Sequence, residues 1–148
     1  MKAFFYHILF FSLLFCSVEL AAQNNLSGTW EGTIEQSKGD LHSEYDLTMK
    51  IVQSGSDIIG RSIISIDGMF VEMEIRGSVH SGIFTQINDT RIIDSKEKDG
   101  IEWCDKSYQL IYKVKEKVKT LEGHWQGNTS FSTCTPGKIF LKKQVVRA

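Results

Sequence analysis

The clearest pattern with possible metal chemistry is a run of polar side chains at alternate positions, namely Asp40, His42, Glu44 and Asp46. Alternate residues of a strand share one face, so these carboxylates and the imidazole could offer ligands to a divalent cation. The opposite face, beginning with Tyr45, carries the apolar residues that a core needs. We therefore interpret the polar set as a solvated face and expect no metal site.

Motifs for catalysis are missing from the sequence. Outside the first 22 residues, the only histidines are His42, His80 and His124, all in polar or turn contexts. There is no Gly-x-Ser-x-Gly elbow, His-Glu-x-x-His pair or glycine-rich phosphate loop. No pair of carboxylates stands out as a glycosidase pair. We predict a protein without catalytic residues or a cofactor.

The N-terminal segment has the three parts of a secretory signal. Lys2 precedes an apolar run over residues 3–18, and Ala21 and Ala22 come before a polar stretch. Cleavage after Ala22 would leave residues 23–148 as one exported domain, secreted or periplasmic, with no membrane span. The apolar run is short for a bilayer, although an uncleaved anchor stays open as the alternative.

Export bears on the three cysteines of the chain. Cys16 would leave with the signal peptide, whereas Cys104 and Cys134 would enter an oxidising compartment, where we expect them to form a disulfide. Closing a loop of about 30 residues would stabilise the fold by about 3–4 kcal/mol. Two cysteines without a nearby pair of histidines make a poor zinc site.

The charges of the chain exclude one class of partner. The formal net charge is −1, and lysines and glutamates are interleaved rather than segregated. A nucleic-acid-binding domain is expected to carry a basic stripe, and none is present. We therefore expect neither a nucleic acid nor an anionic membrane surface as a partner.

Apolar residues alternate with polar ones along most of the chain, the pattern of half-buried strands. Asp67-Gly68 lies between two such runs and is the strongest hairpin signal, because a type I′ turn needs two positive φ angles. Residues 106–119 fit both alternation and a helical face; their aromatic and β-branched content favours a strand. We expect strands over 27–36, 45–52, 58–66, 69–76, 83–94 (one interrupted strand or two short ones), 106–119, 120–127 and 138–146.

Eight or nine short strands in hairpin succession predict an all-β, antiparallel fold. An up-and-down barrel is favoured because closure leaves no exposed strand edge and short connections suit a meander. A β-sandwich is the alternative.

One short motif occurs twice: Gly28-Thr29-Trp30-Glu31-Gly32 near the start and Gly123-His124-Trp125-Gln126-Gly127 near the end. The simplest interpretation is that both tryptophans pack in the core, and the functional one is that they wall a ligand cavity. Gly28-Thr29-Trp30 in the first strand of an exported domain resembles the Gly-x-Trp signature of lipocalins and their calycin relatives. The chain is also similar to small secreted lipocalin-like proteins of Bacteroidota-type bacteria. The lipocalin Thr-Asp-Tyr motif is absent, and no arginine can be assigned to pack on Trp30.

The resemblance implies an eight-stranded barrel with an apolar cavity open at one end. On this interpretation the partner is a small apolar or amphipathic ligand, and no protein partner is identified. A β-module without a cavity, used for surface attachment or protein contact, remains the alternative. The residues expected to face the ligand are Trp30, Tyr45, Met49, Met73, Tyr108, Tyr112 and Trp125.

Overall fold

The computed structural model describes residues 24–38 and 41–145, with the backbone alone for 37, 38, 41 and 42. The predicted signal peptide and Asp40 lie outside the described residues, as does the side chain of His42. All regular elements within these described residues are strands. They are β1 (Gly28–Lys38), β2 (Leu41–Ser54), β3 (Asp57–Ile66), β4 (Met69–His80), β5 (Phe84–Lys96), β6 (Asp105–Lys115), β7 (Val118–Asn128) and β8 (Gly137–Lys143).

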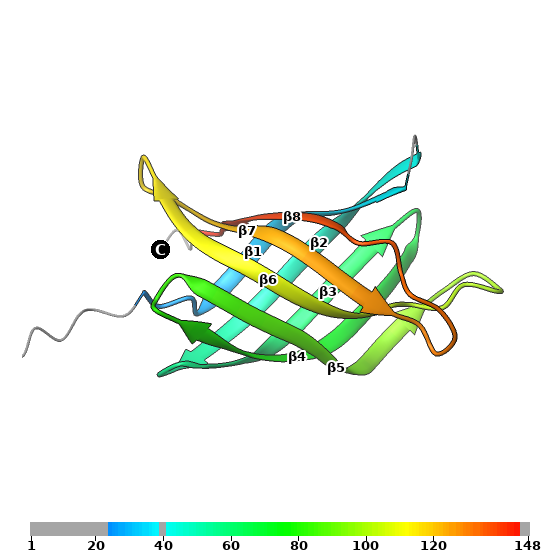
Figure 1. Cartoon of the computed structure of the whole chain (residues 1–148), viewed down its shortest axis with the longest axis horizontal. Coiled ribbons are helices and arrows are strands. Elements are labelled where there is room, and N and C mark those ends of the chain that lie inside the picture. The colour runs from blue at the N-terminus through cyan, green and yellow to red at the C-terminus, as the bar shows by residue number, and fades with distance from the viewer. Residues whose placement is uncertain (1–23, 39–40, 146–148) are drawn as a thin grey trace, which may run out of the picture.

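The eight strands form one closed antiparallel barrel in which each strand pairs with its sequence neighbours (Figure 1). Closure is made by Trp30–Ile34 of β1 against Ile139–Lys143 of β8. The prediction of an up-and-down barrel is confirmed, and the sandwich alternative is wrong. Because every strand has two partners, the sheet has no edge strand, although individual pairings differ in length.

The Asp67–Gly68 turn is confirmed: the φ angles of these residues are 48° and 77°. The strand expected over residues 106–119 is wrong in its extent. A second tight turn at Glu116–Lys117, with φ angles of 50° and 69°, divides this stretch between β6 and β7. Residues 84–94 belong to a single strand, β5, which is interrupted by register shifts against β4, and Ile83 lies in the turn before it.

Inward-facing glycines let strands approach closely inside this small barrel. Gly32 is the clearest case, because a Cβ atom there would lie 2.0 Å from the backbone oxygen of Phe140. Gly123, in the second copy of the tryptophan motif, is equally close to the backbone of Gln109. The glycines beside Trp30 and Trp125 therefore allow the tight bending of β1 and β7.

The end of the barrel near the start of β1 is filled by side chains. Trp30 is fully buried and its indole Nε1 donates a hydrogen bond of 2.8 Å to the backbone oxygen of Leu26. The ammonium of Lys143 lies 5.5 Å from the centre of the Trp30 ring, and Tyr112 meets this ring edge-on at 6.3 Å. The cation over Trp30 is thus a lysine from β8, a residue that the sequence pattern did not single out.

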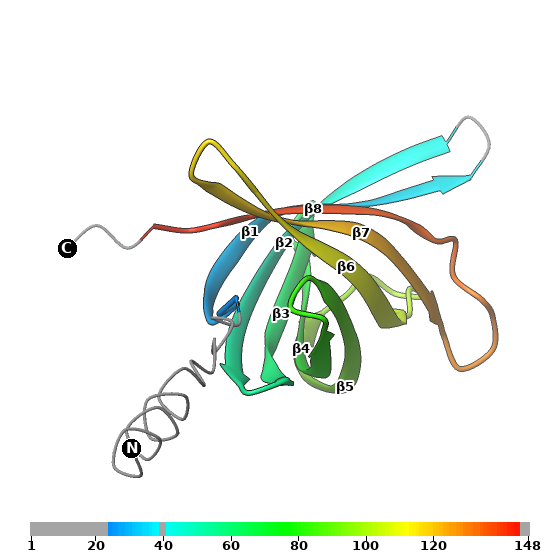
Figure 2. The same ribbon diagram turned by 60° about the vertical axis from the view of Figure 1, so that its left-hand side comes forward.

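Opposite this filled end lie the Asp67–Gly68 turn and the β5–β6 and β7–β8 connections. In Figure 2 the β7–β8 connection, drawn in orange, projects away from the β6–β7 turn.

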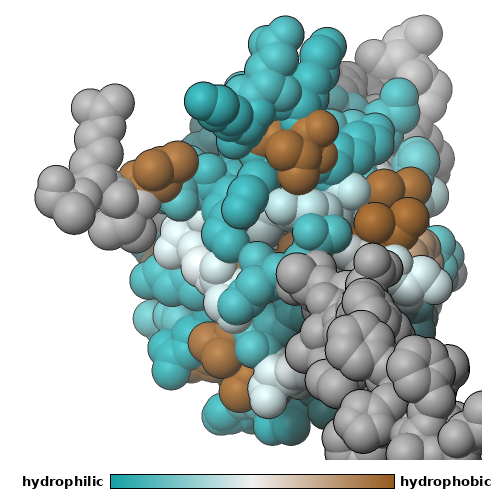
Figure 3. All heavy atoms as spheres, turned by 90° about the vertical axis from the view of Figure 1, so that its left-hand side faces the viewer, coloured by the Kyte–Doolittle hydropathy of each residue, from teal (hydrophilic) through white to brown (hydrophobic). Residues whose placement is uncertain are grey.

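The described residues contain no helix long and apolar enough to cross a membrane. On the face that Figure 3 shows, hydrophobic side chains form separate small patches among hydrophilic ones.

Candidate functional site

A cavity of about 250 Å³ lies inside the barrel at the end that carries the β5–β6 and β7–β8 connections. Its mainly apolar walls come from six of the eight strands and from the β5–β6 connection. The lining residues are Ile34, Gln36, Tyr45, Ile66, Met69, Ile101, Glu102, Trp103, Cys104, Lys106 and Trp125. Side chains from so many elements converge because alternate residues of each strand point inward.

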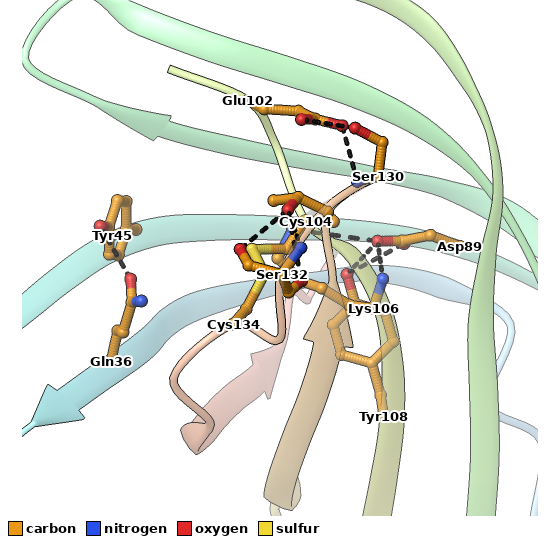
Figure 4. The surroundings of a disulfide bond; sticks show 11 residues. Gln36, Tyr45, Asp89, Glu102, Cys104, Lys106, Tyr108, Ser130, Ser132 and Cys134 are labelled. Atoms are coloured by element: carbon orange, nitrogen blue, oxygen red, sulfur yellow. Dashed lines mark hydrogen bonds and ion pairs between the residues drawn. A yellow bond between two sulfur atoms is a disulfide. The ribbon is translucent and has the colours of Figure 1, made fainter. Parts of the chain in front are cut away.

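The two connections are joined covalently at the rim of the cavity (Figure 4). Cys104 and Cys134 form a disulfide, as predicted, with the two Cα atoms 6.4 Å apart. Glu102 adds polar contacts: its carboxylate accepts hydrogen bonds from the backbone N–H of Ser130 at 2.9 Å and from its hydroxyl at 3.0 Å. The bridge therefore holds residues 101–104 in place over the end of the barrel.

A buried polar cluster lies beside the cavity, where β5 separates from β6. The backbone pairing of these strands ends at Asn88 and Ser107. Beyond it, the Asp89 carboxylate accepts a hydrogen bond from the backbone N–H of Lys106 at 3.0 Å. The Tyr108 hydroxyl donates to the same carboxylate, at 3.0 Å to one oxygen and 3.1 Å to the other. Asp89 thus replaces the missing strand pairing with side-chain contacts.

Lys106 connects this cluster to the cavity. Its side chain is only 6% exposed, and that of Asp89 is fully buried. The Lys106 ammonium donates a hydrogen bond of 2.7 Å to the backbone oxygen of Cys104, and it lies 4.0 Å from the Asp89 carboxylate. It also lies 5.7 Å from the centre of the Trp125 ring. A buried cation on the wall of a cavity is an unusual feature of a core, and it marks a candidate binding group.

Burial perturbs the protonation of the cluster. It raises the pKa of Asp89 to about 6, although the Lys106 charge and the Tyr108 hydrogen bond act in the opposite direction. Burial also lowers the pKa of the Lys106 ammonium, against the attraction of Asp89 and Asp105. The pKa of Tyr108 is raised, first by burial and then by the neighbouring Asp89, so its hydroxyl remains a donor. Both charges are therefore held at a desolvation cost.

Two tryptophans at the cavity differ in their hydrogen bonding. Trp125 Nε1 donates to the backbone oxygen of Glu35 at 2.8 Å, which fixes the ring as a wall. Trp103 Nε1 is buried and has no hydrogen-bond partner among the described residues. A buried N–H without an acceptor is uncommon in folded proteins.

The structure separates the seven predicted ligand residues into two groups. Tyr45 and Trp125 line the cavity, and the Tyr45 hydroxyl donates to Gln36 at 3.2 Å. The others are buried in the packed core without being among the residues that line this cavity. They are Trp30, Met49, Met73, Tyr108 and Tyr112.

Sequence reasoning missed Asp89, Trp103 and Lys106. A signal for Lys106 was present, because it stands in phase with the inward-facing Tyr108. In the polar pattern near Asp40, the side chains of Glu44 and Asp46 are exposed, as expected. Among the described residues, no three acidic, histidine or cysteine side chains gather where they could hold a metal ion.

No family model, curated protein or solved structure matches the chain. The disulfide and the barrel fit an extracellular or periplasmic protein. The chemistry of the cavity is therefore the basis on which a function can be inferred.

Proposed function

We propose that the protein is an exported, lipocalin-like barrel that binds a small, mainly apolar molecule in the cavity beside the disulfide. The observation that carries this proposal is the cavity of about 250 Å³ inside one end of a barrel whose other end is filled. Apolar walls with a few polar groups are the usual composition of a small-molecule site. The role proposed is binding rather than catalysis.

The size of the cavity restricts the ligand. Small-molecule sites usually measure about 300–1,000 Å³, so this one lies just below the common range. It has space for on the order of eight water molecules, at about 30 Å³ each. A compact ligand fits this space, whereas a long lipid chain would have to extend out past residues 101–104.

Two features support export and the lipocalin-like assignment. Residues 1–22 have the composition of a signal peptide, and the disulfide is stable in the compartments that such a signal leads to. Gly28 and Trp30 open the first strand, and Trp30 plugs the filled end beneath the Lys143 cation. This arrangement is similar to the closed end that the Gly-x-Trp resemblance implies.

A second candidate function is contact with another protein through the outer surface. A groove of about 500 Å³ on the outside of the barrel includes three partly exposed apolar side chains, Phe84, Ile111 and Phe140. Its open, outward-facing position favours a surface contact over enclosure of a small molecule. This role does not require the interior cavity.

Native mass spectrometry of the disulfide-bonded protein, purified from its own host, tests ligand binding. We expect a retained small-molecule adduct that is lost when Met69→Trp fills the cavity. Phe70→Trp is the matched control, because Phe70 neighbours Met69 on β4 but does not line the cavity. A bare polypeptide mass, or an adduct equally retained by Met69→Trp, would count against the proposal and favour the outer groove.

A further inference from the structure

The Lys106 ammonium has hydrogen-bonding capacity that its protein contacts do not use. An ammonium has three N–H donors. In the described structure, one donates to the Cys104 backbone oxygen at 2.7 Å. The Asp89 carboxylate is at 4.0 Å, which is an ion pair but too long for a hydrogen bond. Because Lys106 lines the cavity, at least one donor is free for an acceptor placed there.

Trp103 also lines the cavity, but its indole N–H has almost no accessible surface there. Its indole Nε1 is buried and lacks an acceptor, and an indole N–H can only donate. Leaving such a donor unpaired costs about 1–3 kcal/mol in a folded protein. Of these two donors, only the Lys106 ammonium carries a positive charge.

We propose that the ligand is a compact organic carboxylate, bound through its oxygens by Lys106, with its hydrocarbon part against Ile34, Met69 and Trp125. This inference rests on the proposed function and specifies its ligand class. A carboxylate provides several acceptor sites and a negative charge for Lys106. An amine would place a second cation beside the ammonium, and an alcohol would offer a weaker, uncharged acceptor.

The acidic groups around Lys106 set the conditions of binding. Asp89 on β5 is held by Lys106 N–H, by Tyr108 and, at 3.5 Å, by the Ser62 hydroxyl of β3. Asp105 on β6 has an exposed position. Glu102, at the rim, directs its carboxylate to Ser130. Asp89 is thus the anion that competes with a bound carboxylate for the Lys106 charge.

This competition couples ligand binding to a proton. When the ligand anion pairs with Lys106, the ammonium stabilises the charge of the buried Asp89 carboxylate less than before. Asp89 then takes up a proton from solvent, so that the ligand carboxylate is the single anion paired with Lys106. The pKa of Asp89, raised by burial to about 6, already favours this step in mildly acidic solution. Affinity for an ionised carboxylate then falls by up to about tenfold per pH unit above pH 6.

The test is a calorimetric or NMR titration of the disulfide-bonded protein with hexanoate, hexanamide and hexylamine. These probes have nearly the same size and differ in charge. We expect hexanoate to bind about tenfold or more tightly than hexanamide, the difference typical of a hydrogen bond to a charged group, and hexylamine to bind most weakly. Equal affinity for hexanoate and hexanamide would overturn the inference while leaving the proposed function intact.

Three variants test whether Lys106 and Asp89 determine the preference for hexanoate. Lys106→Met should abolish the preference for hexanoate over hexanamide. The matched control Lys143→Met, which removes the other lysine that stands over a tryptophan, should retain it. Asp89→Asn keeps the lysine, removes the competing anion and should make hexanoate binding tighter at pH 6, so the inference remains testable if Lys106→Met does not fold. A preference for hexanoate that survives Lys106→Met, or hexanoate binding that Asp89→Asn does not tighten, would contradict it.

Failure of this inference can be distinguished from failure of the proposed function. If none of the three probes binds but the host-purified protein retains a neutral adduct, the carboxylate assignment is wrong and the cavity still binds a ligand. If no probe binds and the host protein is bare, both proposals are wrong.

Discussion

The Asp89 carboxylate and the Lys106 ammonium lie 4.0 Å apart in the barrel interior, with side chains 0% and 6% exposed. Removing two charges from water at this depth is costly, and their mutual attraction recovers the cost only with good geometry and further hydrogen bonds. Here the carboxylate has backbone and Tyr108 donors, whereas the ammonium has one backbone acceptor. The Lys106 ammonium therefore has fewer hydrogen bonds than the Asp89 carboxylate, and Lys106 is the residue that lines the cavity.

The stability of the protein should depend on pH through Asp89. Its pKa in the folded protein is about 6, above the ordinary 3.8. Because the folded protein binds the Asp89 proton more tightly than the unfolded chain does, this carboxyl contributes to the free energy of unfolding. The contribution is fully present below pH 3.8 and is lost as pH rises through about 6. At about 1.4 kcal/mol per pH unit, the interval corresponds to about 3 kcal/mol. We expect the free energy of unfolding in urea of the wild type, relative to that of Asp89→Asn, to fall by this amount between pH 4 and 7. A constant difference would contradict the assignment.

Asp89 and Lys106 should be energetically coupled. Lys106→Met leaves the Asp89 carboxylate buried without its counterion and should cost about 3–5 kcal/mol at pH 7. Asp89→Asn also leaves a charge unpaired, but it removes an anion that burial disfavours, so it should cost less. The double variant removes both charges and should cost at least about 1–2 kcal/mol less than the sum of the single changes. A double-mutant cycle by denaturant unfolding measures this. Strict additivity would show that the two charges do not interact.

We expect Gly32 to be sensitive to substitution because there is no space for a side chain, and not because of its backbone angles. In Gly32→Ala the new Cβ would lie 2.0 Å from the Phe140 backbone oxygen, so β1 and β8 must move apart. We expect a loss of about 2–3 kcal/mol or more. Gly68→Ala is the control: its φ is 77° but the site is open, so the loss should be about 1 kcal/mol. Similar losses at both positions in thermal unfolding would argue against strand crowding.

The barrel could be predicted because its cues are local. Alternation identified the strands, and Asp67–Gly68 identified a hairpin whose φ angles are positive, as its turn type requires. The turn at Glu116–Lys117 has the same backbone geometry but is built from charged residues that carry no turn signal. The sequence pattern therefore predicted one long strand where the chain has two.

The cavity and its cluster depend on tertiary structure and were less accessible from the sequence. Lys106 could have been suspected from its phase with Tyr108, as an ionisable residue among core positions. Asp89 could not, since its burial follows from the separation of β5 from β6 after Asn88 and from the register shift against β4. Trp103 lies in a connection, where no periodicity indicates which way a side chain points.

Reduction of the Cys104–Cys134 disulfide should both destabilise the barrel and uncover its cavity. The bridge spans 30 residues, so its loss should cost about 3–4 kcal/mol through the greater freedom of the unfolded chain. It also anchors Trp103, which covers the cavity from a connection with no strand partners of its own. Trp30 and Trp125 are held in the barrel by indole hydrogen bonds to backbone oxygens and are at most 4% exposed.

Tryptophan fluorescence quenching by acrylamide separates these two effects. In the Cys104→Ser/Cys134→Ser variant, under conditions where the protein stays folded, quenching should increase, and Trp103→Phe in the same background should remove the increase. Trp125→Phe is the matched control and should leave it in place. If quenching is unchanged while stability falls, the disulfide stabilises the barrel without holding residues 101–104 over the cavity. Hexanoate should then bind the reduced and oxidised proteins equally, whereas an anchored cover predicts weaker binding after reduction because residues 101–104 are no longer held at the cavity.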